Sequence, residues 1–443
     1  MTSTEDEGRP TMVRTPSPRA TGRQPRGAAQ DAPRLEALLG DPDDPANPYG
    51  RAALAAARRA HRPPAGDDEP AGAVPWDDGP YADADRLVRV LRPLLRRDLA
   101  LGHAWAARLL GAAPSSRPDD SVRALLGPAA LVAATGGVLY GTARFVDVRA
   151  PREPAVRQWQ PALAAVFADL LACEALTVTA LRAARPGDGA DPLPAAVVGY
   201  VVPRLVGELL ADLELVLHET GSGPDSTERL ALAALHAQRP ATGVDETAAA
   251  AHRTRLTELL PTLAGPTKAD TDQHMDQVPP PDLFRLDRAA PGLAAPIGDP
   301  HWGQALLSVL PGPVDVGEQE SAAGALARVA RRLAVEQRAV LRACATAGSG
   351  GPDHPAARAL ADRCATVLLA GAALGVARAA GRARDPFLGG PDWILLALER
   401  LAHRLGTPLP AHRAAPRARL WAELAGRTRR GVDCDVRATK LLW

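Results

Sequence analysis

The chain has 443 residues and a formal net charge of +1, with 52 basic and 51 acidic residues. This balance removes the broad electrostatic attraction that nucleic acids exploit, so we expect no nucleic-acid partner. Aromatic residues make up only 3% of the chain, whereas alanine, leucine, arginine and valine dominate, and this composition favours an all-α fold. The length allows more than one domain and a large core.

The N-terminal part of the chain predicts a tail followed by a helical domain. Residues 1–33 are rich in proline, arginine, serine, threonine and glycine without apolar periodicity, which is typical of disorder. An N-terminal helical domain is expected over 34–127, where a short helix begins at Arg34 and a longer one at Asp83, with Pro93 as a kink or restart. No apolar segment opens the chain and the cysteines are scattered, so we expect a cytoplasmic location.

The passage GGVLYGTARFVDVRAPR (136–152) predicts a turn, because it combines paired glycines, a β-branched run and a proline. Around and beyond it, apolar residues at helical spacing predict a helix bundle over 128–264. Residues 265–300 are proline-rich and aperiodic, as in a linker. Helical patterns resume at 302, so a second C-terminal helical domain is expected over 301–443.

One stretch of the sequence is long and apolar enough to be considered as a membrane-spanning helix. Residues 124–143 carry no charge and are about as long as the 20 or so residues that span a bilayer. Pro128, Gly136, Gly137 and Gly141 interrupt the stretch, which favours a buried core helix. The sequence therefore predicts no membrane span.

A search for catalytic motifs finds none with a specific pattern. The ten histidines lack metal-ligand spacing, so no metal site is predicted. Glycine-rich passages such as TGSGPD (220–225) lack the Lys-Ser/Thr ending and the preceding strand of a phosphate loop. His218, which is followed by Glu219, is predicted to lie near the C-terminal end of a helix, where a positive charge interacts favourably with the helix dipole. A contact between His218 and a ligand is the alternative interpretation. No residue is assigned a catalytic role.

Several passages together resemble the acyl-CoA dehydrogenase family, above all its longer bacterial, acyl-CoA oxidase-like members. LEALLGDPDDPANPYG is similar to the start of these proteins, and ADRLVRVLRPLLRRDLALGHAWA to their N-terminal helical domain. LYGTARFVDVRAPR resembles the segment that begins their C-terminal bundle. AAVVGYVVPRLVGELLADLELVLHETGSG resembles the helix and glycine-bearing turn that pack near the flavin. FLGGPDWILLALERLAHRLG resembles their terminal bundle. The likeness covers most of residues 34–443.

The resemblance implies FAD-dependent α,β-dehydrogenation of an acyl-CoA or acyl-carrier thioester, in which a base removes the α-proton and flavin accepts the β-hydride. It also implies a homo- or hetero-oligomer with a homologue, because family members assemble through these bundles. Tyr140, Arg144, His218 and Glu219 are the residues that would line the flavin cleft.

The sequence departs from the family at the flavin site. The family holds flavin in a middle β-domain, but here only residues 111–138 separate Leu110 from Leu139, and their composition is helical. Val138 stands where an arginine commonly reaches the dinucleotide phosphates, and Gly199 where relatives often place lysine. We therefore expect an acyl-CoA dehydrogenase-like protein without the middle β-domain and with degenerate activity.

Two hypotheses stay open at this point. In one, residues 111–138 and a partner subunit rebuild a flavin site. In the other, the chain is a non-catalytic helical interaction partner, or a pseudoenzyme subunit of a complete homologue.

Overall fold

The computed structural model describes residues 28–60, 84–111, 120–184, 191–263, 282–288, 302–310, 322–346, 352–407 and 415–443. Within these ranges the protein is helical without strands, as predicted, and an isolated antiparallel bridge joins Val432 to Lys440. The helices are α1 (Ala28–Leu39), α2 (Arg51–Arg59), α3 (Ala84–Arg97), α4 (Leu99–Gly111), α5 (Asp120–Arg149), α6 (Pro154–Arg157), α7 (Gln160–Ala183), α8 (Leu193–Glu219), α9 (Thr227–Gln238), η2 (Arg239–Thr242), α10 (Glu246–Leu263), η4 (Asp282–Phe284), α11 (Trp302–Val309), α12 (Ala322–Thr346), α13 (Pro355–Arg382), α14 (Pro391–Arg404) and α15 (Ala415–Arg430).

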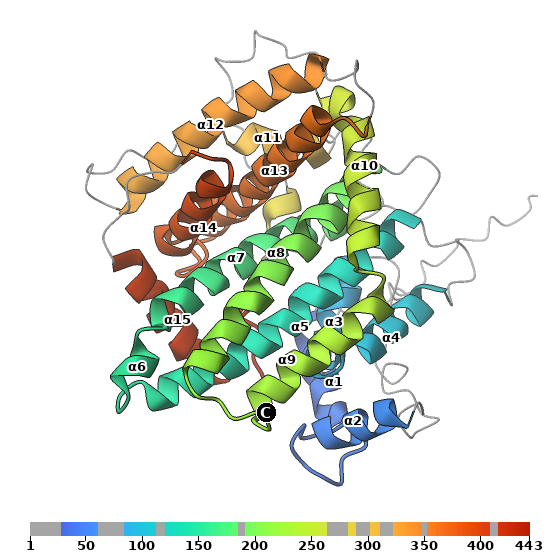
Figure 1. The fold of residues 1–443 in the computed structure, drawn as a ribbon, viewed down its shortest axis with the longest axis vertical. Helices are drawn as coiled ribbons and strands as arrows, with labels where there is room; N and C mark the ends of the chain where they lie inside the picture. Colours follow the sequence, from blue (N-terminus) through green and yellow to red (C-terminus); the bar gives the residue numbers. More distant parts are fainter. Residues whose placement is uncertain are drawn as a thin grey trace, which may run out of the picture.

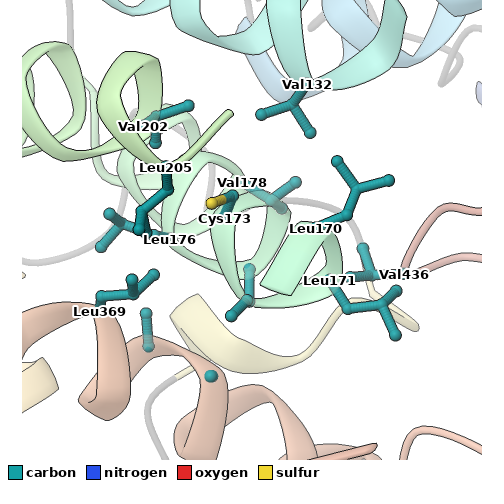
Figure 2. Close-up of a cluster of buried hydrophobic side chains, with 14 of the residues drawn as sticks. Val132, Leu170, Leu171, Cys173, Leu176, Val178, Val202, Leu205, Leu369 and Val436 are labelled. Atoms are coloured by element: carbon teal, nitrogen blue, oxygen red, sulfur yellow. The ribbon is translucent and has the colours of Figure 1, made fainter. Parts of the chain in front are cut away.

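Helix α7 lies at the centre of the fold, between α5 and α8 on one side and α13 and α14 on the other (Figure 1). It carries apolar residues on every side and is buried along almost its entire length, as expected of a helix that other helices cover all round. Figure 2 shows Cys173 and Leu176 of α7 among side chains from neighbouring elements, including Leu205 of α8 and Leu369 of α13. The bundle predicted over 128–264 and the helices after residue 301 therefore meet on one helix.

The predicted turn at 136–152 is wrong for most of its length, because α5 continues unbroken to Arg149. The glycines permit close helix packing instead. A Cβ atom on Gly136 would lie 3.3 Å from Nη2 of Arg92, and one on Gly137 would lie 3.4 Å from the carbonyl oxygen of Arg96. Both arginines belong to α3, so the paired glycines allow α3 to approach α5.

The N-terminal helices differ from the prediction in two details. The first helix begins at Ala28 rather than at Arg34, so the described residues 28–33 of the predicted tail are helical. Pro93 lies inside α3, and the chain breaks instead at Asp98, whose carboxylate accepts a hydrogen bond from the Leu101 amide at 2.9 Å. A side-chain cap of this kind begins the next helix, α4.

The prediction of no membrane span is wrong by the criteria of length and composition. Among the described residues, four helical stretches are long and apolar enough to cross a bilayer: Val122–Arg149, Pro154–Ala183, Leu193–Glu219 and Pro355–Arg382. The interruptions by Pro128 and the glycines did not exclude the first of them, because the helix continues through these residues. In the fold, between 78% and 94% of each apolar window is buried inside the protein. The cytoplasmic location stays a prediction.

Part of the predicted linker 265–300 packs against the core. Leu283 and Phe284 of η4 are buried, and the Phe284 ring lies against α13 at Gly375. The fully buried Arg182 of α7 donates hydrogen bonds to the carbonyl oxygens of Asp282, Leu283, Arg285 and Arg288 at 3.0–3.2 Å. One buried guanidinium therefore satisfies the backbone of this segment, which has few regular hydrogen bonds of its own.

Candidate functional site

Tyr140 and Arg144 lie one helical turn apart on α5, and the structure brings them close to each other. The Tyr140 hydroxyl donates a hydrogen bond to the Thr428 carbonyl of α15 at 3.0 Å, and the Arg96 guanidinium lies 5.7 Å from the centre of its ring. Burial raises the pKa of Tyr140, against the opposing charges of Arg144 and Arg96. The Tyr140 hydroxyl therefore joins α5 to α15, whereas the Arg144 side chain is exposed on the surface.

His218 and Glu219 lie together at the C-terminal end of α8. Nδ1 of His218 is 3.3 Å from a carboxylate oxygen of Glu219, and their side chains are 69% and 49% exposed. This pair faces solvent at the end of a helix, where a cationic histidine is favourable. The neighbouring Thr220 carbonyl accepts a hydrogen bond from Arg149, at the end of α5.

A buried cluster of charged side chains that the sequence did not predict lies where the chain returns after α15. We call it the C-terminal charge cluster and define it as Arg92, Glu174, Asp433 and Asp435. Arg92 donates hydrogen bonds to Glu174 and Asp433, both at 2.6 Å, and its Nε lies 3.7 Å from Asp435. Glu174 also accepts a hydrogen bond from the Val436 amide at 3.1 Å. The cluster thus joins α3, α7 and the C-terminal segment.

Charges within the C-terminal charge cluster are not balanced by Arg92 alone. Arg96 stands 3.6 Å from Asp433, so two arginines face the three carboxylates. Burial raises the pKa of Glu174 to about 7, and the nearby charges of Asp435 and Asp433 add to this effect while Arg92 opposes it. Burial also disfavours the charge on Asp433, but Arg92 and Arg96 outweigh that effect and hold its pKa below the ordinary value. Of Glu174 and Asp433, Glu174 is therefore the carboxyl group that retains a proton more readily.

A second buried ion-pair group supports the same segment. Asp85 of α3 accepts hydrogen bonds from Arg437 of the C-terminal segment and from Arg182 of α7, the latter at 3.4 Å. Arg427 donates to the carbonyl oxygens of Asp433 and Asp435 at 3.0 and 2.6 Å. The C-terminal segment is thus held by guanidinium groups of α3 and α15 and by the Glu174 carboxyl group of α7.

A pocket of about 120 Å³ opens between α8, α13 and α14. Its polar lining includes Tyr200, Arg204, Asp362 and Arg404, and its apolar lining includes leucines of α8 and α14. The Tyr200 hydroxyl donates a hydrogen bond to Asp362 and accepts one from Arg204 at 3.2 Å. Arg404 pairs with Asp169 and Glu208 at 2.8 and 2.9 Å. Tyr200, Arg204 and Asp362 are therefore engaged with one another, whereas Arg404 pairs with residues outside the pocket lining.

The residues present do not fit FAD in the manner that the resemblance implies. None of Tyr140, Arg144, His218 and Glu219 lines this pocket, which is also far smaller than the roughly 300–1,000 Å³ of typical cofactor sites. Val138 is buried in the core, and a Cβ atom on Gly199 would lie 2.5 Å from the His252 ring. Among the described residues, no group of three or more histidine, cysteine, aspartate and glutamate side chains could hold a metal ion.

The C-terminal charge cluster leaves only a weak signal in the sequence. Glu174 is an isolated acid inside the apolar run LLACEALTV, and a charge at such a position requires a buried partner. Its partners come from positions 92, 433 and 435, and no local spacing identifies them. Asp245, an acidic residue that follows the glycine-rich turn after α8, accepts a hydrogen bond from the Ala248 amide and caps α10.

No family model, curated protein or solved structure matches the chain.

Proposed function

We propose that this chain is a non-catalytic, acyl-CoA dehydrogenase-like helical protein whose function is association through its helices. The observation that carries the proposal is the short distance along the chain between the two helical regions. Helix α4 ends at Gly111 and α5 begins at Asp120, so only residues 112–119 separate them. A β-domain needs several strands of about five or six residues each, and this interval cannot supply them.

The side chains at the implied flavin site also support a non-catalytic role. Dehydrogenation needs a positioned base and a hydride acceptor. The Tyr140 hydroxyl is engaged with α15, Gly199 is packed against His252, and Asp245 caps a helix. These positions contribute to packing and helix capping, and none of them lines the pocket between α8, α13 and α14.

Exposed apolar side chains at one end of the bundle support association. Val148 near the end of α5 is 70% exposed, Leu215 near the end of α8 is 48% exposed, and Leu230 in the first turns of α9 is 55% exposed. The ends of α5 and α8 are joined there by the hydrogen bond from Arg149 to Thr220, and α9 packs against both helices. All three side chains lie near this end of the bundle, where the proposal places the contact with a partner.

The test compares the purified full chain with a complete acyl-CoA dehydrogenase prepared in the same way. We expect the chain to show no flavin absorbance and no acyl-CoA-dependent reduction of an electron-acceptor dye, with or without added FAD. The complete enzyme, as the positive control, reduces the dye. A flavin spectrum together with dye reduction by the chain alone would overturn the proposal.

A further inference from the structure

Helix α12 presents a row of arginines to solvent. It lies at the upper edge of the molecule and packs against α10, α13 and α14 (Figure 1). Residues 328–342 contain one acidic residue, Glu336, which is buried and paired with Arg363 of α13. The exposed side chains of the same stretch include five arginines: Arg328, Arg331, Arg332, Arg338 and Arg342. The outer face of α12 therefore concentrates positive charge in a chain whose net charge is +1.

Most of this charge is not compensated within the described part of the chain. Four of the arginines form no ion pair with a carboxylate of the described residues: Arg331, Arg332, Arg338 and Arg342. Among them stands Val335, which is 47% exposed. One stripe along the helix consists of Arg331, Val335, Arg338 and Arg342, which follow one another at steps of four, three and four residues and so share a face.

The C-terminal half of α8 presents the opposite charge with the same spacing. Residues 205–219 contain four acids and neither arginine nor lysine. All four acids are exposed: Glu208, Asp212, Glu214 and Glu219. Between them lies Leu215, which is 48% exposed. One stripe consists of Glu208, Asp212, Leu215 and Glu219, again at steps of four, three and four. Glu208 is paired with Arg404 at 2.9 Å, so Asp212 and Glu219 carry most of the free charge of this stripe.

We propose that α12 of one copy of the chain packs antiparallel against the C-terminal half of α8 of a second copy. Because the two stripes have the same steps, this arrangement sets Leu215 opposite Val335. It also sets each acid of the α8 stripe opposite an arginine of the α12 stripe: Glu208 opposite Arg342, Asp212 opposite Arg338 and Glu219 opposite Arg331. An apolar contact flanked by opposite charges is the arrangement expected of a specific interface.

The direction of packing and the need for a second copy both follow from the geometry. A parallel arrangement would set Asp212 opposite Val335 and Leu215 opposite Arg338, which loses both the apolar contact and an ion pair. Within one chain α12 lies at the upper edge, whereas α8 ends beside α9 at the lower end, so the two stripes do not meet there (Figure 1). The inference rests on the proposed function, association through helices, and it names the partner.

The test measures the molar mass of the full chain by sedimentation over a range of protein concentrations. We expect concentration-dependent self-association at low salt that weakens at about 1 M salt, where the Debye length is about 3 Å. Arg331→Glu/Arg338→Glu and Asp212→Arg/Glu219→Arg should each weaken self-association by about tenfold or more, because like charges then face each other. An equimolar mixture of the two variants should recover the association, because opposite charges again meet across the interface.

The matched control reverses two exposed arginines elsewhere. Arg59→Glu/Arg123→Glu, on α2 and α5, changes the net charge by the same amount as the α12 variant and should associate like the wild type. Every substituted position is exposed, and the salt dependence of the wild type is a measurement that needs no variant.

Three results would overturn the inference: a wild type that is monomeric at every concentration, association that neither variant weakens, or a mixture that stays dissociated. A monomeric wild type that binds anionic vesicles or nucleic acid through α12 falls under the first of these. The proposed function is tested separately, since flavin absorbance with dye reduction would overturn it whatever the charge variants show.

Discussion

The pH dependence of stability should be controlled in part by Glu174. Its pKa lies at about 7 in the folded protein, against 4.5 for an ordinary glutamate, chiefly because the group is buried. A pKa difference of one unit between the folded and unfolded states corresponds to about 1.36 kcal/mol of unfolding free energy. Retaining the proton on Glu174 therefore stabilises the folded state by about 3 kcal/mol. The contribution is fully present below about pH 4.5 and is lost as the pH rises through about 7, because the folded protein must then ionise a buried carboxyl group.

Urea unfolding of the wild type and of Glu174→Gln at pH 4.5 and pH 8 measures this contribution. Glutamine resembles the protonated side chain at every pH, and Arg92 keeps its pairs with Asp433 and Asp435. Between pH 4.5 and pH 8 the wild type should therefore lose about 3 kcal/mol more unfolding free energy than the variant. Glu214→Gln, a change at an exposed position of α8, should keep the wild-type pH dependence. Equal pH dependence in the wild type and Glu174→Gln would refute the reasoning, as would a difference of opposite sign.

Two further predictions concern packing. Arg182→Met should lower the unfolding free energy measured in urea titrations by about 3–5 kcal/mol. The reason is that the substitution leaves Asp85 and the carbonyl groups of 282–288 with fewer hydrogen-bond partners. A loss below about 1 kcal/mol would contradict this prediction. Gly375→Ala should lower the melting temperature, because its Cβ atom would lie 2.4 Å from the Phe284 ring. Gly207→Ala on α8, where a Cβ atom would meet nothing within 4 Å, is its control and should be neutral or stabilising by up to about 1 kcal/mol. Equal effects of the two alanine substitutions would show that the Phe284 contact is unimportant.

The positions of helices could be predicted from the sequence where the apolar residues of one helix face recur at regular spacing. Apolar residues at three- and four-residue steps predicted the helices after Pro154, and the structure places α7 and α8 there. The glycines at 136 and 137 were misread, because a turn and a close helix contact both require glycine. Only the position of α3 distinguishes these alternatives, and it depends on tertiary packing.

The candidate site was less predictable than the fold. Tyr140 and Arg144 are neighbours on α5 by helical spacing, whereas the partner of the Tyr140 hydroxyl is Thr428, far away in the sequence. The same holds for Arg92 and Asp433, whose ion pair joins the N-terminal helices to the end of the chain. Buried charges require partners, but the requirement does not specify which residues supply them.

Direct measurement of FAD binding tests the central claim most closely. Equilibrium dialysis of the full chain against FAD, with a complete acyl-CoA dehydrogenase stripped of its flavin as the positive control, measures binding without depending on turnover. We predict no saturable binding to the chain, because residues 112–119 leave no room for a flavin-holding domain between α4 and α5. Saturable binding of one FAD per chain would contradict the account.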